Sequence, residues 1–166
     1  EISTIQRFVL YLGHPTYSLS VGLCSFLLFS GLGSSWAGKK GLGQRGAMRA
    51  GFAVVVLLLL QALLLPVVLQ STLAWSEPLR IVVTMATIAP LAFAMGIPFP
   101  TGLSLLRNEQ QGMIGWAFGV NGAASVMASI LSILVAMEGG FFVVTLVAAG
   151  LYAMAALTAP RAAQEA

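Results

Sequence analysis

The chain has 166 residues, of which 58% are hydrophobic and 8% are charged, and its mean hydropathy is +0.95. Soluble domains carry about 25% charged residues, so this composition excludes a globular protein with a water-covered surface. The net charge of +3 comes from a few localised basic residues, which argues against nucleic acid as a partner and favours a positive cytoplasmic loop of a protein in a lipid bilayer.

The first twelve residues have a helical apolar face that ends at Gly13-His14-Pro15. Twelve helical residues cover only about 18 Å, which is too short to cross a bilayer. Two interpretations fit: an amphipathic helix at the interface, or the tail of a spanning helix (residues 1–12). His14 is the chain's single histidine. An interfacial position is the simpler interpretation, and a functional role is the alternative.

Five later segments are apolar over about the length that a membrane helix needs. The predicted fold is therefore all-α: one polytopic transmembrane helical bundle over residues 1–166, with five full spans and a partial N-terminal helix. The spans are predicted at residues 17–37, 50–69, 81–97, 113–137 and 141–159.

The segment between the first two spans, residues 38–49, carries four basic residues and no acid. By the positive-inside rule it is cytoplasmic, and alternation of the spans then places the C-terminus on the same side. Gly41–Gly46 matches G-x-G-x-x-G, but it follows no strand, so a flexible basic hairpin is a better interpretation than a nucleotide site.

A proline–glycine break formed by Pro98, Pro100 and Gly102 follows the third span. We expect Pro98-Phe99-Pro100 to end regular helix before a short amphipathic piece at Thr101–Leu106. A polar turn at Arg107–Gln111 then leads into the fourth span.

The fourth span carries small and polar residues at helical intervals. Gly115, Gly119 and Ala123 are spaced by four, and a second set steps by three, four and three: Gly122, Ser125, Ser129 and Ser132. In lipid, small residues along one face let two helix backbones approach closely, and hydroxyls bond across the contact. The sequence therefore predicts that this helix is the packing centre of the bundle.

Two amides lie at predicted membrane depth, Gln61 in the second span and Asn121 in the fourth. We expect both to hydrogen-bond a neighbouring helix, and the alternative is that they line a substrate path. The single cysteine, Cys24, and the single histidine do not form a metal-ligand pattern. No catalytic motif, paired carboxylate or phosphate loop is present, so we expect no catalytic, metal or cofactor site.

Three stretches together resemble a known family. They contain Gln6-Arg7 with Gly13-His14-Pro15, the break Pro98-Phe99-Pro100-Thr101-Gly102, and Trp116 with Asn121-Gly122 and Ser125. The chain resembles the C-terminal membrane region of bacterial membrane-bound spermidine-synthase-like proteins, in which an aminopropyltransferase/methyltransferase-type domain is fused to membrane helices. That region is itself distantly similar to major facilitator transporters.

The resemblance implies that residues 1–12 end a spanning helix begun upstream and that the protein resides in the bacterial inner membrane. It also implies a scaffold domain that is non-catalytic by itself, with an added role as a conduit for a lipophilic or polyamine-type substrate. The expected partners are the bilayer and a soluble transferase domain of the same protein or other membrane subunits. The alternatives are a transporter-like module for a small solute and an accessory subunit of a larger membrane complex.

Overall fold

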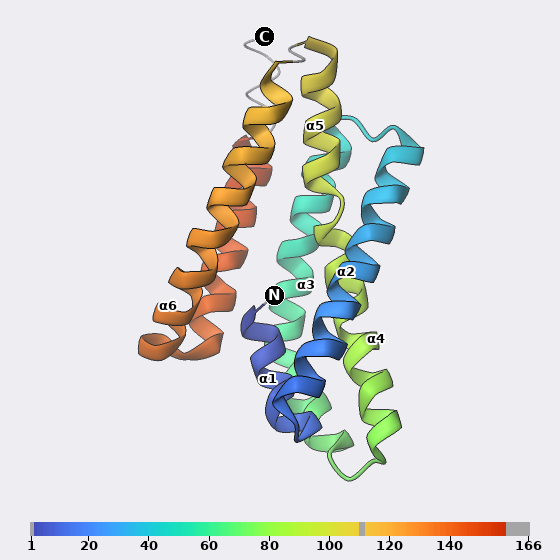
Figure 1. Cartoon of the computed structure of the whole chain (residues 1–166), viewed down its shortest axis with the longest axis vertical. Coiled ribbons are helices and arrows are strands. Elements are labelled where there is room, and N and C mark those ends of the chain that lie inside the picture. Colours follow the sequence, from blue (N-terminus) through green and yellow to red (C-terminus); the bar gives the residue numbers. More distant parts are fainter. Residues whose placement is uncertain (1, 110–111, 159–166) are drawn as a thin grey trace.

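The computed structural model describes residues 2–109 and 112–158 and folds them into a bundle of helices (Figure 1). Within this part of the chain there is no strand, and the predicted all-α class is confirmed. The helices are α1 (Ile2–Leu12), α2 (Pro15–Lys40), α3 (Gln44–Thr72), α4 (Glu77–Met95), α5 (Pro98–Glu109) and α6 (Met113–Thr158). Residue 159 of the predicted fifth span and Gln110–Gln111 of the predicted turn lie outside the described residues.

Four helical stretches are long and apolar enough to cross a membrane: α2, α3, Glu77–Ser104 and α6. The last of these holds both the fourth and fifth predicted spans. It is interrupted at Gly140, whose φ of 74° and ψ of 171° lie outside the helical region. The chain reverses there, so α6 is a hairpin with a first arm (residues 113–139) and a second arm (residues 141–158) (Figure 1).

The basic segment 38–49 is mostly helical, which corrects the expected flexible hairpin. α2 continues through Lys40 and α3 begins at Gln44, so the connection between them is only three residues long. Gly41 ends α2 in the left-handed conformation, and its N–H bonds the carbonyls of Ala37 and Gly38. Glycine adopts this left-handed conformation without steric strain and commonly ends a helix. The glycine-rich sequence therefore makes a tight turn between two long helices.

The break after the third span occurs at Gly96–Ile97, and the prolines behind it begin α5. The prediction that regular helix ends at Pro98-Phe99-Pro100 is wrong, because these residues form the first turn of α5. A proline in the first helical turn costs nothing, because that N–H has no partner inside the helix. Buried Thr101 donates its hydroxyl to the Ile97 carbonyl at 2.8 Å and so satisfies one acceptor of the break.

Helices α2 and α4 contact each other closely through two glycines. A Cβ atom at Gly33 would overlap the carbonyl oxygen of Phe93, and one at Gly96 would overlap the carbonyl oxygen of Ser30. Gly51 of α3 packs in the same manner against Ala156 on the second arm of α6, where a Cβ would lie 3.0 Å from the alanine Cβ. Small residues therefore do hold these helices together.

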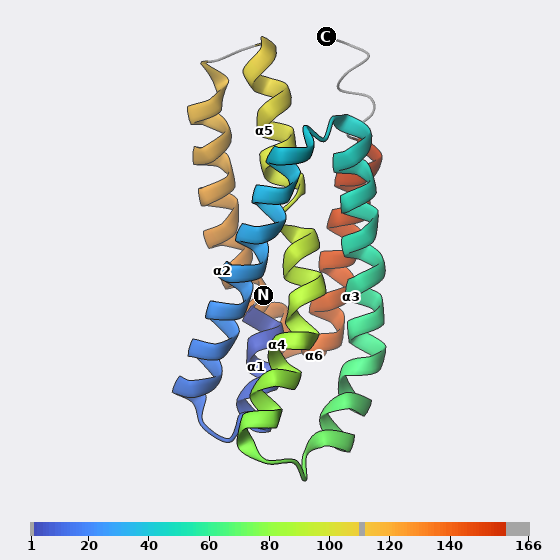
Figure 2. The ribbon, with the colours of Figure 1, turned by 90° about the vertical axis from the view of Figure 1, so that its right-hand side faces the viewer.

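The main apolar cluster lies at the end of the bundle that carries His14, which we call the His14 end. Helix α1 contributes half of this cluster although it is the shortest helix in the described chain, and Figure 2 places it among the other helices. The buried members are Ile5, Phe8, Tyr11, Leu12, Phe26, Leu65, Ile88 and Ala92.

The prediction that the fourth span is the packing centre is wrong. No residue between 113 and 148 is buried, and the two arms of α6 lie on opposite sides of the molecule in Figure 2. The second arm packs on α3, whereas the first arm stands at the periphery. The spacing of small residues defines a face that a helix can approach closely, but it does not identify the approaching helix.

Candidate functional site

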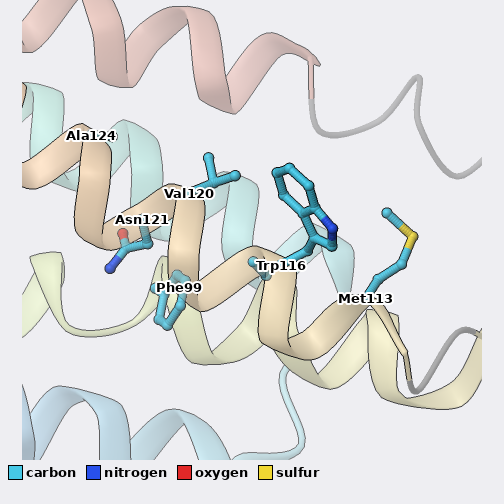
Figure 3. Close-up of a pocket in the computed structure, with 7 residues that line it drawn as sticks. Phe99, Met113, Trp116, Val120, Asn121 and Ala124 are labelled. Atoms are coloured by element: carbon cyan, nitrogen blue, oxygen red, sulfur yellow. The ribbon is translucent and has the colours of Figure 1, made fainter.

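An open cleft lies between the start of α5 and the first arm of α6 (Figure 3). Phe99 of α5 meets Phe118 of α6 edge to face, with ring centroids 5.3 Å apart, and this contact joins the two helices. The cleft has a volume of about 520 Å³. Its lining is apolar except for one amide, and consists of Phe99, Met113, Trp116, Ala117, Val120, Asn121 and Ala124.

Asn121 is exposed in this cleft, and Figure 3 shows its amide beside Phe99. Its side chain makes no hydrogen bond with any other described residue, so the predicted interhelical bond is not formed in the part of the chain that the structure describes. Its backbone carbonyl accepts a bond from Ser125 at 2.8 Å. An amide without a partner is unfavourable in an apolar medium, and Asn121 is thus the polar group of the cleft that needs a ligand or a neighbour.

The glycines of the first arm form a second open surface. A Cβ atom built on Gly115, Gly119 or Gly122 would meet no neighbouring atom within 4 Å. Ser125 and Ser129 donate their hydroxyls at 2.8 Å to carbonyls one turn earlier on the same helix, not across a helix contact. We call the side formed by Gly115, Gly119, Gly122 and Val126 the glycine face.

The other predicted site residues do not gather at this arm. Gln61 is half-buried on α3, and its amide nitrogen has no hydrogen-bond partner among the described residues. His14 is exposed in the turn before α2, where its carbonyl accepts the Ser18 N–H at 3.0 Å. Pro98, Pro100 and Gly102 are half-buried on α5 and position Phe99 at the cleft.

Sequence reasoning missed a polar cluster at the His14 end. Arg80 donates from Nη1 to the Tyr11 carbonyl at 2.8 Å, and its guanidinium carbon lies 5.9 Å from the Tyr11 ring centroid. The Tyr11 hydroxyl is 2.7 Å from the Thr72 hydroxyl in a buried contact. A cation at the C-terminus of a helix stabilises the terminal carbonyls. Arg80 therefore anchors α1, although the sequence suggested only a loop charge.

Arg7 of α1 is the second functional candidate that the sequence analysis did not select. Its side chain is half-buried, and its guanidinium carbon lies 5.9 Å from the centroid of the Phe141 ring, at the start of the second arm of α6. The sequence did contain a signal for Arg7, because this residue is a basic side chain beside the helical apolar face of residues 1–12.

The fold defines a helical protein with four stretches suited to crossing a membrane. Among the residues that the structure describes, no three His, Cys, Asp or Glu side chains gather where they could hold a metal ion. No family model, curated protein or solved structure matches the chain.

Proposed function

We propose that this chain is a membrane scaffold domain, non-catalytic by itself, in a protein similar to the membrane-bound spermidine-synthase-like family. The observation that supports the proposal is the first arm of α6, which combines an open glycine face, an unpaired amide and many exposed apolar side chains. A scaffold needs such a surface, because it must hold another membrane component by close helix contact.

The packing inside the chain supports this use of the glycine face. Where α2 and α4 meet, Gly33 and Gly96 bring each helix against a carbonyl group of the other. Gly115, Gly119 and Gly122 have the same small-residue character, and a Cβ atom at any of them would meet no described atom within 4 Å. We therefore propose that a helix of a further membrane component packs there.

The proposed topology has five crossings. At 1.5 Å per residue the two arms of α6 are ~40 and ~27 Å long, so each is long enough to cross most of a ~30 Å hydrocarbon layer. In this topology the α2–α3 turn and the C-terminus are cytoplasmic in the bacterial inner membrane, and the His14 end faces outward.

The cleft supports a lipophilic conduit better than a polyamine path or a solute transporter. A polyamine is a cation and needs carboxylates or several polar groups, whereas Asn121 is the single polar residue of the lining. A transporter requires a polar cavity that reaches the middle of the bilayer. An apolar cleft with one amide instead suits a molecule with a long hydrocarbon part and one polar group.

Photo-crosslinking in intact membranes tests the scaffold proposal. The photoreactive residue benzoylphenylalanine is placed at Val126, which is 64% exposed on the glycine face, or at Leu27, which is 73% exposed on α2. We expect a discrete protein adduct from position 126 and only lipid adducts from position 27. Adding Gly119→Leu and Gly122→Leu should remove the protein adduct. Lipid adducts alone at both positions would refute the proposed scaffold role.

A further inference from the structure

Arg7 is a cation on a helix that packs inside the bundle. Its neighbour Ile5 is 4% exposed and lies against Gly22 of α2, where a Cβ would be 2.9 Å from the isoleucine Cγ1. Phe8, on the other side of Arg7, is completely buried. Gly22 is ~10 Å along α2 from Pro15 at a rise of 1.5 Å per residue. Arg7 is therefore set back from the His14 end, near the boundary of the hydrocarbon layer in the proposed topology.

The polar edge of the Arg7 guanidinium has no acceptor in the described chain. The guanidinium carbon lies over the Phe141 ring, 5.9 Å from its centroid, and a ring offers no hydrogen-bond acceptor to the N–H edge. Arg7 has no hydrogen bond and no ion pair with a described residue. The nearest acid in sequence to Phe141 is Glu138, which is exposed at the turn of α6. Figure 1 shows that this turn lies level with α1, not at the lower tip of the bundle.

An unpaired cation at this depth is stabilised by an anionic partner. Intramembrane basic residues are costly unless they pair or extend to the interface. The guanidinium fork matches the oxygens of a phosphate group, which it binds through two parallel N–H bonds. Arg80 at the same end already uses one N–H on the Tyr11 carbonyl, and the four basic residues of segment 38–49 lie at the opposite end.

We propose that Arg7, together with Phe141, forms a binding site for an anionic phosphate group in the half of the bundle that carries His14. Phe141 lies beside the guanidinium, and the guanidinium N–H groups bind the phosphate oxygens. The phosphate comes from an anionic phospholipid headgroup or from a soluble phosphate-bearing ligand. This site is independent of the scaffold role, because it involves neither the glycine face nor the cleft.

Lipid titration of the full chain in neutral detergent tests the proposal. Phosphatidylglycerol or phosphatidylcholine is added, and bound lipid is counted by native mass spectrometry. We expect preferential binding of phosphatidylglycerol, and Arg7→Gln should weaken it about tenfold, the change that corresponds to one strong contact. Arg45→Gln removes the same charge at the opposite end and should leave binding unchanged. Inorganic phosphate should compete strongly if the ligand is a soluble phosphate, and weakly if it is the lipid.

Two further variants keep the proposal falsifiable if Arg7→Gln folds poorly. Arg7→Lys retains a charge without the fork, so it should fold normally and bind phosphatidylglycerol more weakly than the parent. Glu138→Gln removes the nearest negative charge and should strengthen binding. Equal binding of both lipids by the parent chain, or a loss of binding in Glu138→Gln, would overturn the phosphate site. The latter result would show that lipid binding depends on the Glu138 carboxylate, which an anion site at Arg7 does not allow.

Discussion

At the scale of single residues, glycines in this chain fall into two groups with opposite surroundings. Gly33 and Gly96 lie where a side chain would strike the backbone of a neighbouring helix, whereas Gly119 and Gly122 lie in open space. The sequence shows small residues at helical spacing in both places. Only the positions of the other helices decide which glycines are needed for folding and which are available to a partner.

Substituting one glycine of each group should therefore separate folding from association. Gly33→Ala places a methyl group on the Phe93 carbonyl and should destabilise the bundle by about 1–3 kcal/mol, as overpacking commonly does. Gly119→Ala meets no atom and removes a poor helix former, so the stability should stay constant or rise by up to ~1 kcal/mol. Thermal unfolding followed by circular dichroism in detergent measures both variants.

Leucine in place of alanine should enlarge the difference in stability between the two glycine positions. Gly119→Leu should leave the melting temperature of the purified chain unchanged, and Gly33→Leu should prevent a cooperative transition. If Gly119→Leu unfolds the isolated chain as Gly33→Leu does, the first arm of α6 packs against its own bundle and the assigned periphery is wrong.

At the scale of elements, Gly140 determines the shape of α6. The apolar sequence on both sides favours one continuous helix, and the reversal depends on a residue with φ of 74° and ψ of 171°. This combination is almost restricted to glycine, because a Cβ atom strains it. Without the reversal, the second arm could not pack its Ala156 against Gly51 of α3.

Gly140→Ala should consequently lower the stability of the bundle by about 1–3 kcal/mol. The matched control is Gly150→Ala, because Gly150 lies in the regular part of the second arm and a Cβ there would also meet no atom within 4 Å. The control should be neutral or slightly stabilising. Chemical unfolding in mixed micelles compares the two, and equal effects would show that the backbone conformation at Gly140 is not the cause.

The sequence was most informative about where helices occur and least informative about which helices touch. Hydropathy located the ends of α2, α3 and α4 to within six residues, and the gap between the fourth and fifth predicted spans coincides with the turn of α6. The pairing of Gly33 with Phe93 joins residues far apart in the chain, and no local pattern encodes it. The contact between Arg7 and Phe141 could not be predicted from the sequence for the same reason, because Phe141 belongs to the last helix.

At the scale of the whole molecule, the charges indicate how the bundle is placed in the bilayer. The connection between α2 and α3 is flanked by four basic residues, Lys39, Lys40, Arg45 and Arg49. The α3–α4 connection contains no basic residue between Thr72 and Glu77. Positive residues are retained on the cytoplasmic side during insertion, so the His14 end should face outward.

Cysteine labelling tests this orientation and the number of crossings together. In a Cys24→Ser background, single cysteines replace Gly43 in the α2–α3 connection, Ser76 before α4, or Glu138 in the turn of α6. A membrane-impermeant maleimide applied to intact cells should label positions 76 and 138, and position 43 only after permeabilisation. Labelling of 43 from outside would reverse the topology. If 138 behaved like 43 while 76 was labelled from outside, the first arm of α6 would not cross the bilayer, because the turn at Gly140 would lie on the same side as the α2–α3 connection.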